Sequence, residues 1–360
     1  MNDLLHIASH FLIKGIPVSV KPLGDGLIND TYKVTTAGED TPDYVLQRIN
    51  TDIFTDVDML QRNIISVTGH IRSKLREAGE TDLSRKTLTV VMADDGKAYR
   101  REGGSCWRMT VFIPRARTFD TVNTAHSYSA GTAFGRFEAM LADIGEMPGE
   151  IIPDFHNMEL RLRQLDDAVT NDAAGRASGV RDLLGELERR AFGMCEAERL
   201  HREGVLPKRV CHCDTKVNNI MFDEDGSVLC VIDLDTVMPG FIFSDYGDFL
   251  RSAANTGLED DPDPGNVSFD MDIFRAFTRG YIAEARSFLL PVETSRLPYA
   301  AALFPYMQCV RFLTDYINGD TYYKTRYEEH NLVRARAQFR LLQSAEEHAG
   351  EMRAFVESCL

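Results

Sequence analysis

The sequence lacks the features of disulfide-bonded, zinc-ribbon, nucleic-acid-binding and membrane proteins. Its seven cysteines are an odd number and form no C-x-x-C pair, so neither a disulfide framework nor a zinc ribbon is expected. Lys and Arg number 40 against 55 Asp and Glu, a net charge of −15, which disfavours nucleic acid and anionic membranes. The first residues have no basic start, and His6, His10 and Lys14 interrupt the apolar run, so neither a signal peptide nor a membrane span is predicted. We therefore expect a cytoplasmic protein.

The length and composition indicate a folded protein with two parts. The chain has 360 residues, more than the roughly 250–300 at which a single hydrophobic core stops growing. Hydrophobic residues make up 44% and charged residues 26% of the chain, which is typical of a globular protein and not of a disordered or coiled-coil chain. The acidic balance leaves open a small neutral or cationic ligand, or an anion that a metal ion holds locally.

The first third of the sequence predicts a small antiparallel sheet. Six short runs of β-branched and aromatic residues are separated by turns that contain Gly or Asp. Between the third and fourth runs, apolar residues recur at helical spacing from Asp58 to Ala78, and Gly79 follows as a stop signal. The pattern therefore predicts one helix against the sheet. The predicted strands are Val18–Leu23, Tyr32–Thr35, Tyr44–Ile49, Leu88–Met92, Ala98–Arg101 and Cys106–Phe112.

After Pro114 the pattern becomes mostly helical. The change predicts an α+β protein with two lobes: a small antiparallel β N-lobe with one helix over residues 1–113, a short hinge, and a large, mostly helical C-lobe over residues 114–360. The predicted helices of the C-lobe are Tyr128–Ile144, Leu160–Val169, Ser178–Arg202, Asp272–Phe288, Ala300–Asn318 and Leu332–Glu357, and its strands are Lys208–Cys213, Ile220–Phe222 and Leu229–Ile232.

One stretch of the C-lobe gathers residues that suit chemistry. Asp214, Lys216 and Asn219 follow an apolar strand in a tight loop, and the next hairpin ends in Asp233. A carboxylate and an amide are hard oxygen ligands, which suit Mg²⁺ and its phosphates better than zinc. A neighbouring carboxylate that is not a metal ligand could orient a hydroxyl group and accept its proton. Two cysteines also flank His212, but alternation on a buried strand explains them better than a metal does.

These motifs resemble a known group of enzymes. The pattern H-x-D-x-K-x-x-N, followed by an apolar strand and an Asp, resembles the catalytic loop and metal-binding Asp of protein-kinase-like phosphotransferases. HCDTKVNN (212–219), VIDLD (231–235) and DYGD (245–248) are similar to the aminoglycoside phosphotransferase and choline kinase branch. VIDLDTVMPG (231–240) and the segment 311–334 are similar to N-acetylhexosamine 1-kinases, which phosphorylate the anomeric hydroxyl of free GlcNAc or GalNAc. This similarity extends nearly end to end, through IASHF (7–11), GDGLINDTY (24–32) and LQRIN (46–50).

The resemblance implies a two-lobed protein-kinase-like fold and a role for each loop residue. Asp214 is expected to be the catalytic base, and Lys216 to neutralise charge on the transferring phosphoryl group. Asn219 and Asp233 are expected to hold Mg²⁺, with ATP as the co-substrate.

Three nearby side chains have supporting or open roles in this interpretation. His212 is expected to brace the loop by hydrogen bonds, and Asp245 to buttress it. Asp235 is left open, as either a second metal ligand or a partner in a hydrogen-bond network.

The N-lobe fits a nucleotide roof. Gly24, Asp25, Gly26 and Asn29 belong to a glycine-containing turn between two strands, where backbone amides can approach phosphates. Most turns of this kind are plain hairpins, and Leu27 stands where the relatives have His. The hinge is predicted at 110–114, so that the backbone of Phe112 and Ile113 could pair with adenine.

The sequence departs from the kinase pattern at Gln47. A lysine on the third strand would fall at this position, and its usual glutamate partner on the following helix is also absent, since the first acid after Met59 is Glu77. Losing both charges together avoids leaving one of them buried and unpaired. The N-acetylhexosamine 1-kinases share this Gln, so the loop, Mg²⁺ and Lys216 are expected to hold the phosphates. The only tryptophan, Trp107, is expected to be a core residue.

The acceptor sugar is expected at the last long helices. Arg311, Asp315 and Asn318 share one helical face, and Tyr322 lies in the turn that follows. An Arg can donate several hydrogen bonds to neighbouring hydroxyls, and a Tyr can add one or line the acetamido group. By spacing alone, a salt bridge between Arg311 and Asp315 is the simpler interpretation. The resemblance instead favours Arg311, Tyr322 and Asp315 as substrate-binding residues.

Three functions compete. The first is an ATP-dependent N-acetylhexosamine 1-kinase. The second is another small-molecule kinase of the same fold that acts on an aminoglycoside, choline or homoserine. The third is a non-catalytic nucleotide-binding protein, which Gln47 suggests and the intact Asp214, Asn219 and Asp233 oppose. The expected partners are ATP and a small acceptor, with no nucleic acid, no membrane and no obligate protein partner.

Overall fold

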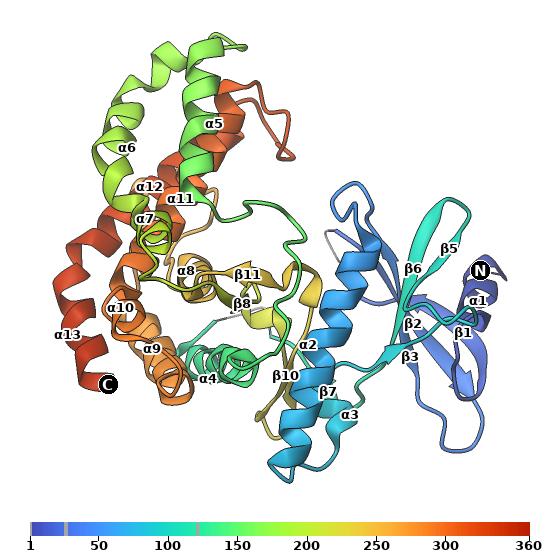
Figure 1. Ribbon diagram of the computed structural model, residues 1–360. Coiled ribbons are helices and arrows are strands. Elements are labelled where there is room, and N and C mark those ends of the chain that lie inside the picture. The colour runs from blue at the N-terminus through green and yellow to red at the C-terminus, as the bar shows by residue number, and fades with distance from the viewer. Residues whose placement is uncertain (1, 25–27, 120–121) are drawn as a thin grey trace. The chain divides into compact units, whose positions relative to one another are not determined.

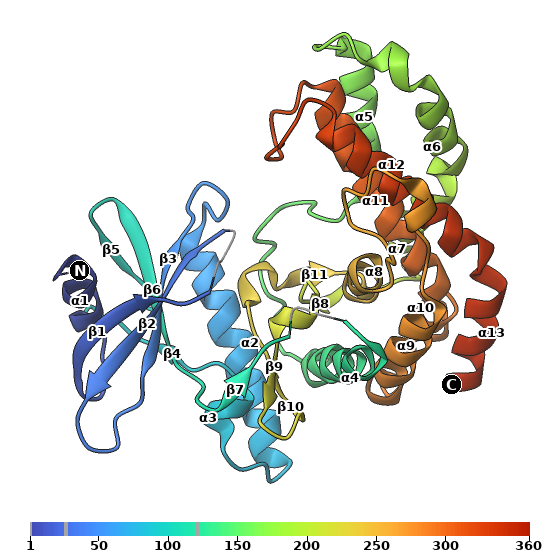
Figure 2. The same ribbon diagram turned by 180° about the vertical axis from the view of Figure 1, so that it is seen from behind.

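The chain folds into two compact units. The computed structural model describes residues 2–24, 28–119 and 122–360. The first unit contains residues 1–118, 143–152 and 220–238, and the second contains 119–142, 153–219 and 239–360. The first unit thus includes two segments that come later in the sequence than residue 113. The functional division into lobes at that residue stays a prediction. Figures 1 and 2 show the elements of both units from opposite sides.

The first unit is built on the antiparallel sheet that the sequence predicts. Its strands follow the order β1-β2-β3-β6-β4, and β5 pairs with β6 at the other end of that strand. A smaller sheet of order β10-β9-β7 completes the unit. The bounds are β1 (Ile16–Pro22), β2 (Asp30–Ala37), β3 (Tyr44–Ile49), β4 (Val90–Val91), β5 (Arg100–Glu102), β6 (Ser105–Val111), β7 (Ala116–Arg117), β9 (Ile220–Asp223) and β10 (Val228–Val231).

One face of the main sheet is covered by a helix that the sequence reading missed. Helix α1 (Asn2–Ser9) and the residues after it pack Ile7, Ala8 and Phe11 against a buried cluster that includes Leu46 and Trp107. The prediction that Trp107 is a core residue is therefore confirmed. Alternation along the strands places Gln47 and Arg108 on the other face. Helix α1 was missed because it has only eight residues, and polar residues interrupt its apolar ones.

Helix α2 (Val57–Glu77) matches the predicted helix within one residue at each end. Asp56 caps it by accepting a hydrogen bond of 2.8 Å from the backbone N–H of Met59. Its Asn63 side chain bonds the carbonyl oxygens of Gly149 (2.7 Å) and Val237 (3.1 Å), and so ties the two later segments to the first. The short helix α3 (Leu83–Lys86) adds a bidentate pair between Arg85 and Asp223.

The second unit is mostly helical, as the sequence predicts. Its two short strands, β8 (Arg209–Cys211) and β11 (Met238–Gly240), pair with each other. The helices are α4 (Thr124–Leu141), α5 (Met158–Asn171), α6 (Arg181–Met194), α7 (Glu196–Arg202), α8 (Ile242–Ala253), α9 (Met271–Ala285), α10 (Pro291–Thr294), α11 (Leu297–Ile317), α12 (His330–Glu347) and α13 (Ala349–Cys359).

Two helix predictions need correction, and one long helix was missed. The helix expected over 178–202 is broken at Cys195 (φ −92°, ψ 17°), and the one expected over 332–357 is broken at His348 (φ −96°, ψ 2°). Apolar periodicity does not register a change of direction made by a single residue. Helix α8 was missed, although its apolar residues Ile242, Phe243, Tyr246, Phe249 and Leu250 recur at helical spacing. Every residue from Ile242 to Leu250 is buried, including the polar ones.

Helices α4 and α9 approach each other closely through glycines. A Cβ atom added at Gly131 would lie 2.1 Å from the carbonyl oxygen of Phe277, and one at Gly280 would lie 2.2 Å from that of Tyr128. Real Cβ atoms do not come so close to backbone oxygen. Glycine at these positions is therefore a requirement of the packing.

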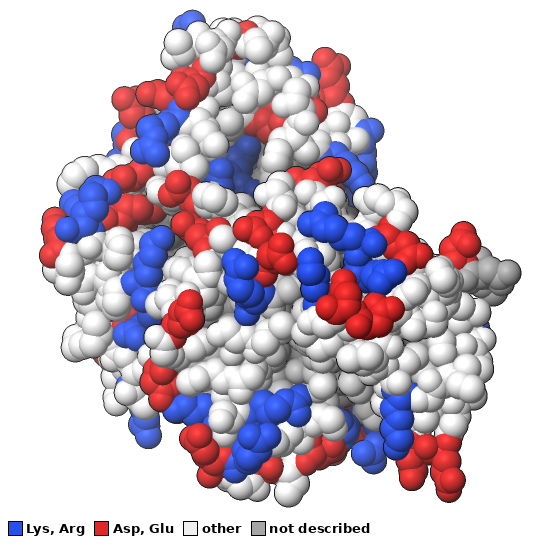
Figure 3. Space-filling view, turned by 45° about the vertical axis from the view of Figure 1, so that its right-hand side comes forward, with Lys and Arg blue, Asp and Glu red and all other residues white. Residues whose placement is uncertain are grey.

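One face of the molecule carries charges of both signs, and the cysteine thiols are free. On the face drawn in Figure 3, acidic and basic side chains are interspersed. All seven cysteines fall within the described residues and are free thiols. Among the described helices, none has a stretch that is both long and apolar enough to cross a membrane.

Candidate active site

The loop of residues 212–219 follows strand β8 and is hydrogen-bonded to helix α8. The Asp245 carboxylate accepts hydrogen bonds of 2.7 Å from the backbone N–H groups of both His212 and Cys213. The Thr215 hydroxyl donates to the backbone carbonyl of Asp245 at 2.8 Å. The prediction that Asp245 buttresses this loop is confirmed.

The turn into Asp214 requires an unusual backbone conformation. Cys213 has φ +61°, in the left-handed region that costs a non-glycine residue roughly 1–3 kcal/mol. The bonds from Asp245 hold it there. His212 is fully buried against Phe134 and Phe137, and its Nδ1 accepts the Asp214 N–H at 3.3 Å. His212 therefore braces the loop, as predicted.

The three polar residues of the loop lie together. Lys216 Nζ is 2.6 Å from Asp214 Oδ1, and Asn219 Nδ2 donates to the Asp214 carbonyl oxygen at 2.8 Å. Burial lowers the pKa of Lys216, but Asp214, helped by Asp248, outweighs it and raises the pKa above its ordinary value, so Lys216 is cationic. The Asn219 amide nitrogen faces Asp214, which leaves the amide oxygen as the group available to a ligand.

Asp233 and Asp235 belong to the first unit and differ in their surroundings. Asp233 has φ +58° and begins the short 3₁₀ helix η3 (Leu234–Thr236). Asp235 is buried, and both its oxygens are engaged: Arg108 binds it through Nη1 and Nη2, and Asn29 Nδ2 donates to it at 2.6 Å. Of the two roles left open by the sequence, the structure assigns Asp235 the network partner.

Gln47 takes part in the same network. Its Oε1 accepts from Arg108 Nε at 2.9 Å, and its Nε2 donates to Thr31 Oγ1 at 3.0 Å. Gln47 and Arg108 are directly opposite each other on β3 and β6. The cation that the kinase pattern would place at residue 47 is thus found one strand away. Sequence reasoning missed Arg108, although its opposite position on the neighbouring predicted strand was a usable signal.

The residues predicted to contact the nucleotide are only partly described. Gly24 has φ +71°, and Asn29 Oδ1 accepts the Asn50 N–H at 2.9 Å while its Nδ2 reaches Asp235. Asp25 and Gly26 lie outside the described residues.

The predicted hinge residues lie at the end of β6. The Phe112 N–H donates to the Asp43 carbonyl oxygen at 2.9 Å, and Lys33 Nζ lies 4.0 Å from the centre of the Phe112 ring. Ile113 is buried. Because the Phe112 N–H is already used, its carbonyl oxygen or the Ile113 backbone is left for an adenine, and the hinge stays a prediction.

The structure separates Arg311 from Asp315. Asp315 is buried, and it accepts bonds of 2.8–2.9 Å from the N–H groups of Thr321, Tyr322 and Tyr323 and from Asn331 Nδ2. Its two oxygens are therefore filled by the turn that follows α11, and the simple salt bridge with Arg311 is wrong. Asp315 shapes the turn, and its direct contact with a substrate remains only a prediction.

Arg311 lies in an aromatic setting. Its guanidinium is 5.7 Å from the ring centres of both Phe155 and Tyr323, and it donates to Gln308 at 3.3 Å. Tyr322, the predicted sugar contact, is 73% exposed, whereas the neighbouring Tyr323 is partly buried. Tyr323 is therefore better placed beside Arg311 than Tyr322 is.

Two further polar residues of this region were missed by sequence reasoning. Arg161 Nη2 bonds the Phe155 carbonyl oxygen at 2.6 Å, while its Nε and His156 Nδ1 are buried without a hydrogen-bond partner in the described part of the chain. Burial, followed by Arg311 and Arg161, lowers the pKa of His156 to about 3, and Asp214 acts in the opposite direction. His156 is therefore neutral. The stretch 154–161 has no motif that would mark it in a sequence.

A second group of buried acids has a structural explanation. Tyr281 donates a hydrogen bond to Glu138, and burial and the nearby Asp245 raise the pKa of Glu138 well above its ordinary value. Burial likewise raises the pKa of the Cys211 thiol. The hydrogen bond from Tyr281 gives Glu138 a structural role in the buried core.

The comparisons with known proteins agree with this geometry. The profile of the phosphotransferase enzyme family (APH) matches residues 19–285. The chain belongs to this family. Solved structures of similar fold include an amicoumacin kinase in complex with AMP-PNP, Ca²⁺ and Ami, at a TM-score of 0.59 and 15% identity, with coverage of 94% of this chain and 92% of that one.

Two further structures show the same fold with other named activities. A spectinomycin phosphotransferase in complex with ADP and spectinomycin has a TM-score of 0.57 and 11% identity, covering 97% of this chain and 98% of that one. A choline kinase from Streptococcus pneumoniae has a TM-score of 0.51 and 15% identity, covering 93% and 94%. The aminoglycoside phosphotransferase and choline kinase-like fold expected from the sequence is confirmed, and the protein is a phosphotransferase.

Proposed function

We propose that the protein transfers the γ-phosphoryl group of ATP to the anomeric hydroxyl of an N-acetylhexosamine, GlcNAc or GalNAc. The observation that carries this proposal is the braced loop in which Asp214, Lys216 and Asn219 lie together. Family membership supports the reaction class. The similarity of residues 231–240 and 311–334 to N-acetylhexosamine 1-kinases supports the sugar.

In the proposed reaction, Asp214 accepts the proton of the sugar hydroxyl. The hydroxyl oxygen forms a bond to the γ-phosphorus, the bond from that phosphorus to the bridging oxygen breaks, and ADP leaves. A hemiacetal hydroxyl is more acidic than an ordinary alcohol, so a carboxylate is basic enough to take its proton late in the transfer. Lys216, a cation at 2.6 Å from Asp214, neutralises negative charge on the transferring group.

Mg²⁺ fits the proposed ligands. The Asn219 amide oxygen and the Asp233 carboxylate are the hard oxygen donors that this ion prefers. When bound, Mg²⁺ would neutralise charge on the phosphates of ATP. The pKa values of the buried Cys211 and Cys213 thiols are raised, which disfavours the thiolate form that zinc binds.

Arg108 is proposed to supply the positive charge that Gln47 lacks. Its Nε and one N–H on each Nη are used by Gln47 and Asp235, which leaves two N–H groups of the guanidinium for phosphate oxygens. Asp235 fixes the guanidinium, as a carboxylate partner fixes the lysine of other kinases. The first unit would then supply a cation for the phosphates.

The surroundings of Arg311 favour a neutral, hydroxyl-rich acceptor over a cationic one. Arg311 and Arg161 are both cations, and after burial they are the main causes that lower the pKa of the neutral His156. Choline or an aminoglycoside would bring a further positive charge to this place. A sugar instead offers hydroxyl oxygens to the Arg161 Nε–H and a hydroxyl or N–H to His156, where the structure leaves polar atoms unpaired.

A panel of acceptors tests the proposal. ADP release with ATP and Mg²⁺ is measured for GlcNAc, GalNAc, choline, kanamycin and homoserine. The proposal expects turnover with the two sugars, and phosphorus NMR should show coupling to the proton on carbon 1. Turnover with choline or kanamycin alone would support the alternative of another small-molecule kinase, and no turnover with any acceptor would favour a nucleotide-binding protein.

Asp214→Asn gives the sharpest test of the base. The substitution keeps the shape of the side chain but removes its basicity and its charge, so we expect turnover to fall by roughly 10²–10⁴-fold. The Asp214 side chain is partly exposed, so the fold should persist, which circular dichroism would check. Turnover within a few-fold of the wild type would remove Asp214 from the proposed mechanism.

A further inference from the structure

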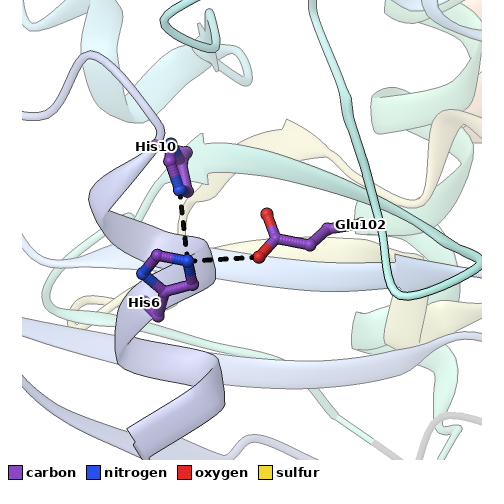
Figure 4. Close-up of side chains that lie close together, drawn as sticks. All are labelled: His6, His10 and Glu102. Atoms are coloured by element: carbon purple, nitrogen blue, oxygen red, sulfur yellow. Dashed lines mark hydrogen bonds and ion pairs between the residues drawn. The ribbon is translucent and has the colours of Figure 1, made fainter.

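His6 lies in helix α1 and His10 in the turn that follows it, one helical turn further along the chain. The orientation of the helix is fixed by its packing. Ile7, Ala8 and Phe11 are buried in the core of the first unit and anchor the helix on the sheet. His6 and His10 therefore lie on the side of the helix that meets the β5–β6 hairpin, where Glu102 ends β5 (Figure 4).

The ligand atoms of these three residues converge. His6 Nε2 lies 3.5 Å from His10 Nε2 and 3.3 Å from Glu102 Oε1, and all three ligand atoms lie within 4.8 Å of one another. A tetrahedral ion with bonds of about 2.0–2.1 Å separates neighbouring ligand atoms by about 3.3–3.4 Å. Two of the three separations therefore have the length that one shared ion would give.

A second carboxylate orients one of the histidines. Asp94 Oδ2 is 2.7 Å from His10 Nδ1, and Arg100 Nη1 donates to Asp94 at 2.9 Å. A carboxylate on Nδ1 holds the proton there and leaves the Nε2 lone pair facing His6, which is how ligating histidines are oriented in metal sites.

We propose that His6, His10 and Glu102 bind one divalent transition-metal ion, Zn²⁺ by the character of the ligands. Two imidazoles and a carboxylate suit Zn²⁺, and they leave a fourth position for water. Arg100 lies 3.4 Å from the other oxygen of Glu102, and its charge moderates the affinity.

Within the first unit, the site lies on the other side of the sheet from Gln47 and Arg108. Helix α1 covers the face of the sheet that carries Leu46 and Trp107, whereas Gln47 and Arg108 lie on the opposite face. The ion therefore acts as a clamp between the N-terminal helix and the β5–β6 hairpin. Because it binds the folded state, it raises the stability of the protein by mass action.

Metal titration of the full chain without a polyhistidine tag tests the proposal. After treatment with a chelator, the protein is titrated with ZnCl₂ by calorimetry, and its thermal unfolding is followed with and without zinc. We expect one saturable zinc ion per chain and a rise in Tm. Co²⁺ in place of zinc should give the visible bands of a nitrogen and oxygen site, without the near-ultraviolet charge transfer of thiolate ligands.

Matched variants locate the ion. His6→Ala removes a largely exposed ligand and should abolish saturable binding while leaving the Tm of the metal-free protein unchanged. Asp94→Asn should weaken binding about 10- to 100-fold. His70→Ala, which removes another histidine paired with an aspartate, should bind zinc as the wild type does. Saturable binding that survives both His6→Ala and Glu102→Gln, or none in the wild type, would overturn the site.

Discussion

Arg108 places on strand β6 the positive charge that the kinase pattern would place at residue 47 on the neighbouring strand β3. It lies opposite Gln47, bonds it through Nε, and forms a bidentate pair with Asp235. A buried cation without a partner is costly, so Arg108 requires a carboxylate beside it. Asp235 meets that requirement from a segment distant in the sequence.

A cation on β3 instead of β6 should largely preserve kcat/KM for ATP, whereas removing the cation should lower it. Arg108→Gln with Asp235→Asn removes the charge pair without stranding one partner, and we expect kcat/KM for ATP to fall roughly 10- to 100-fold, the scale of a lost charged hydrogen bond. Gln47→Lys with Arg108→Gln keeps a cation beside Asp235 and should lose less. Steady-state kinetics with varied ATP measure both, and equal kcat/KM in the neutral pair and the wild type would contradict the proposed role.

His156 should make stability depend on pH in the acid range. Its pKa is about 3 in the folded protein and about 6.5 when unfolded, so between these values the unfolded chain binds more protons. The contribution of His156 to the free energy of unfolding is therefore fully present above about pH 6.5. It is lost as the pH drops toward 3, by as much as about 1.4 kcal/mol per pH unit. Urea unfolding of the wild type and of His156→Gln at several pH values should show a shallower dependence in the variant, and parallel curves would contradict the prediction.

At the scale of elements, the catalytic loop depends on helix α8. Asp245 of this helix fixes the two backbone N–H groups that precede Asp214, and it holds Cys213 in its left-handed conformation. The loop is thus pre-organised by a helix that begins about thirty residues later in the chain. A strained backbone at such a position persists because its surroundings determine it more strongly than its own preference does.

The contact between α4 and α9 provides a test of packing at this scale. In Gly280→Ala, the new Cβ would lie 2.2 Å from the Tyr128 carbonyl oxygen, so the helices must move apart, and we expect a loss of about 1–3 kcal/mol or more in the free energy of unfolding. Gly185→Ala in α6 is the matched control, because open space surrounds that position. It should gain up to about 1 kcal/mol from helix propensity. Thermal unfolding measures both changes, and a loss of equal size in both would contradict the packing argument.

At the scale of the whole molecule, the first unit is assembled from three segments of the chain. Residues 143–152 and 220–238 join residues 1–118 through buried polar contacts, among them the pair of Arg85 with Asp223 and the bonds of Asn63. Folding this unit therefore requires residues from well beyond the point where the sequence pattern changes.

Asn63 is the side chain that tests this assembly. It donates to the Gly149 and Val237 carbonyl oxygens, and its Oδ1 accepts the Gly149 N–H at 2.9 Å. Asn63→Ala removes three buried hydrogen bonds, so we expect a loss of about 2–4 kcal/mol in the free energy of unfolding. Ser66→Ala, at an exposed position of the same helix, should change it by less than about 0.5 kcal/mol. Denaturant titration with both variants would contradict the assembly if they unfolded at the same midpoint.

The sequence by itself determined the α+β class, the strands β1, β2, β3 and β6, helix α2, and the loop that contains Asp214, Lys216 and Asn219. These features are local: alternation and helical spacing follow from the direction of successive side chains, and the loop residues are neighbours in the chain.

Only the tertiary structure decided which distant residues meet. It pairs Asp235 with Arg108. It bonds Asp315 to the turn at 321–323 instead of to Arg311. It also brings His156 and Arg161 into the surroundings of Arg311. It also showed that in helix α8 the polar residues Ser244, Asp245 and Asp248 are buried together with the apolar ones. Hydrogen bonds and burial between remote segments depend on how the elements pack, and no spacing within a single segment records that packing.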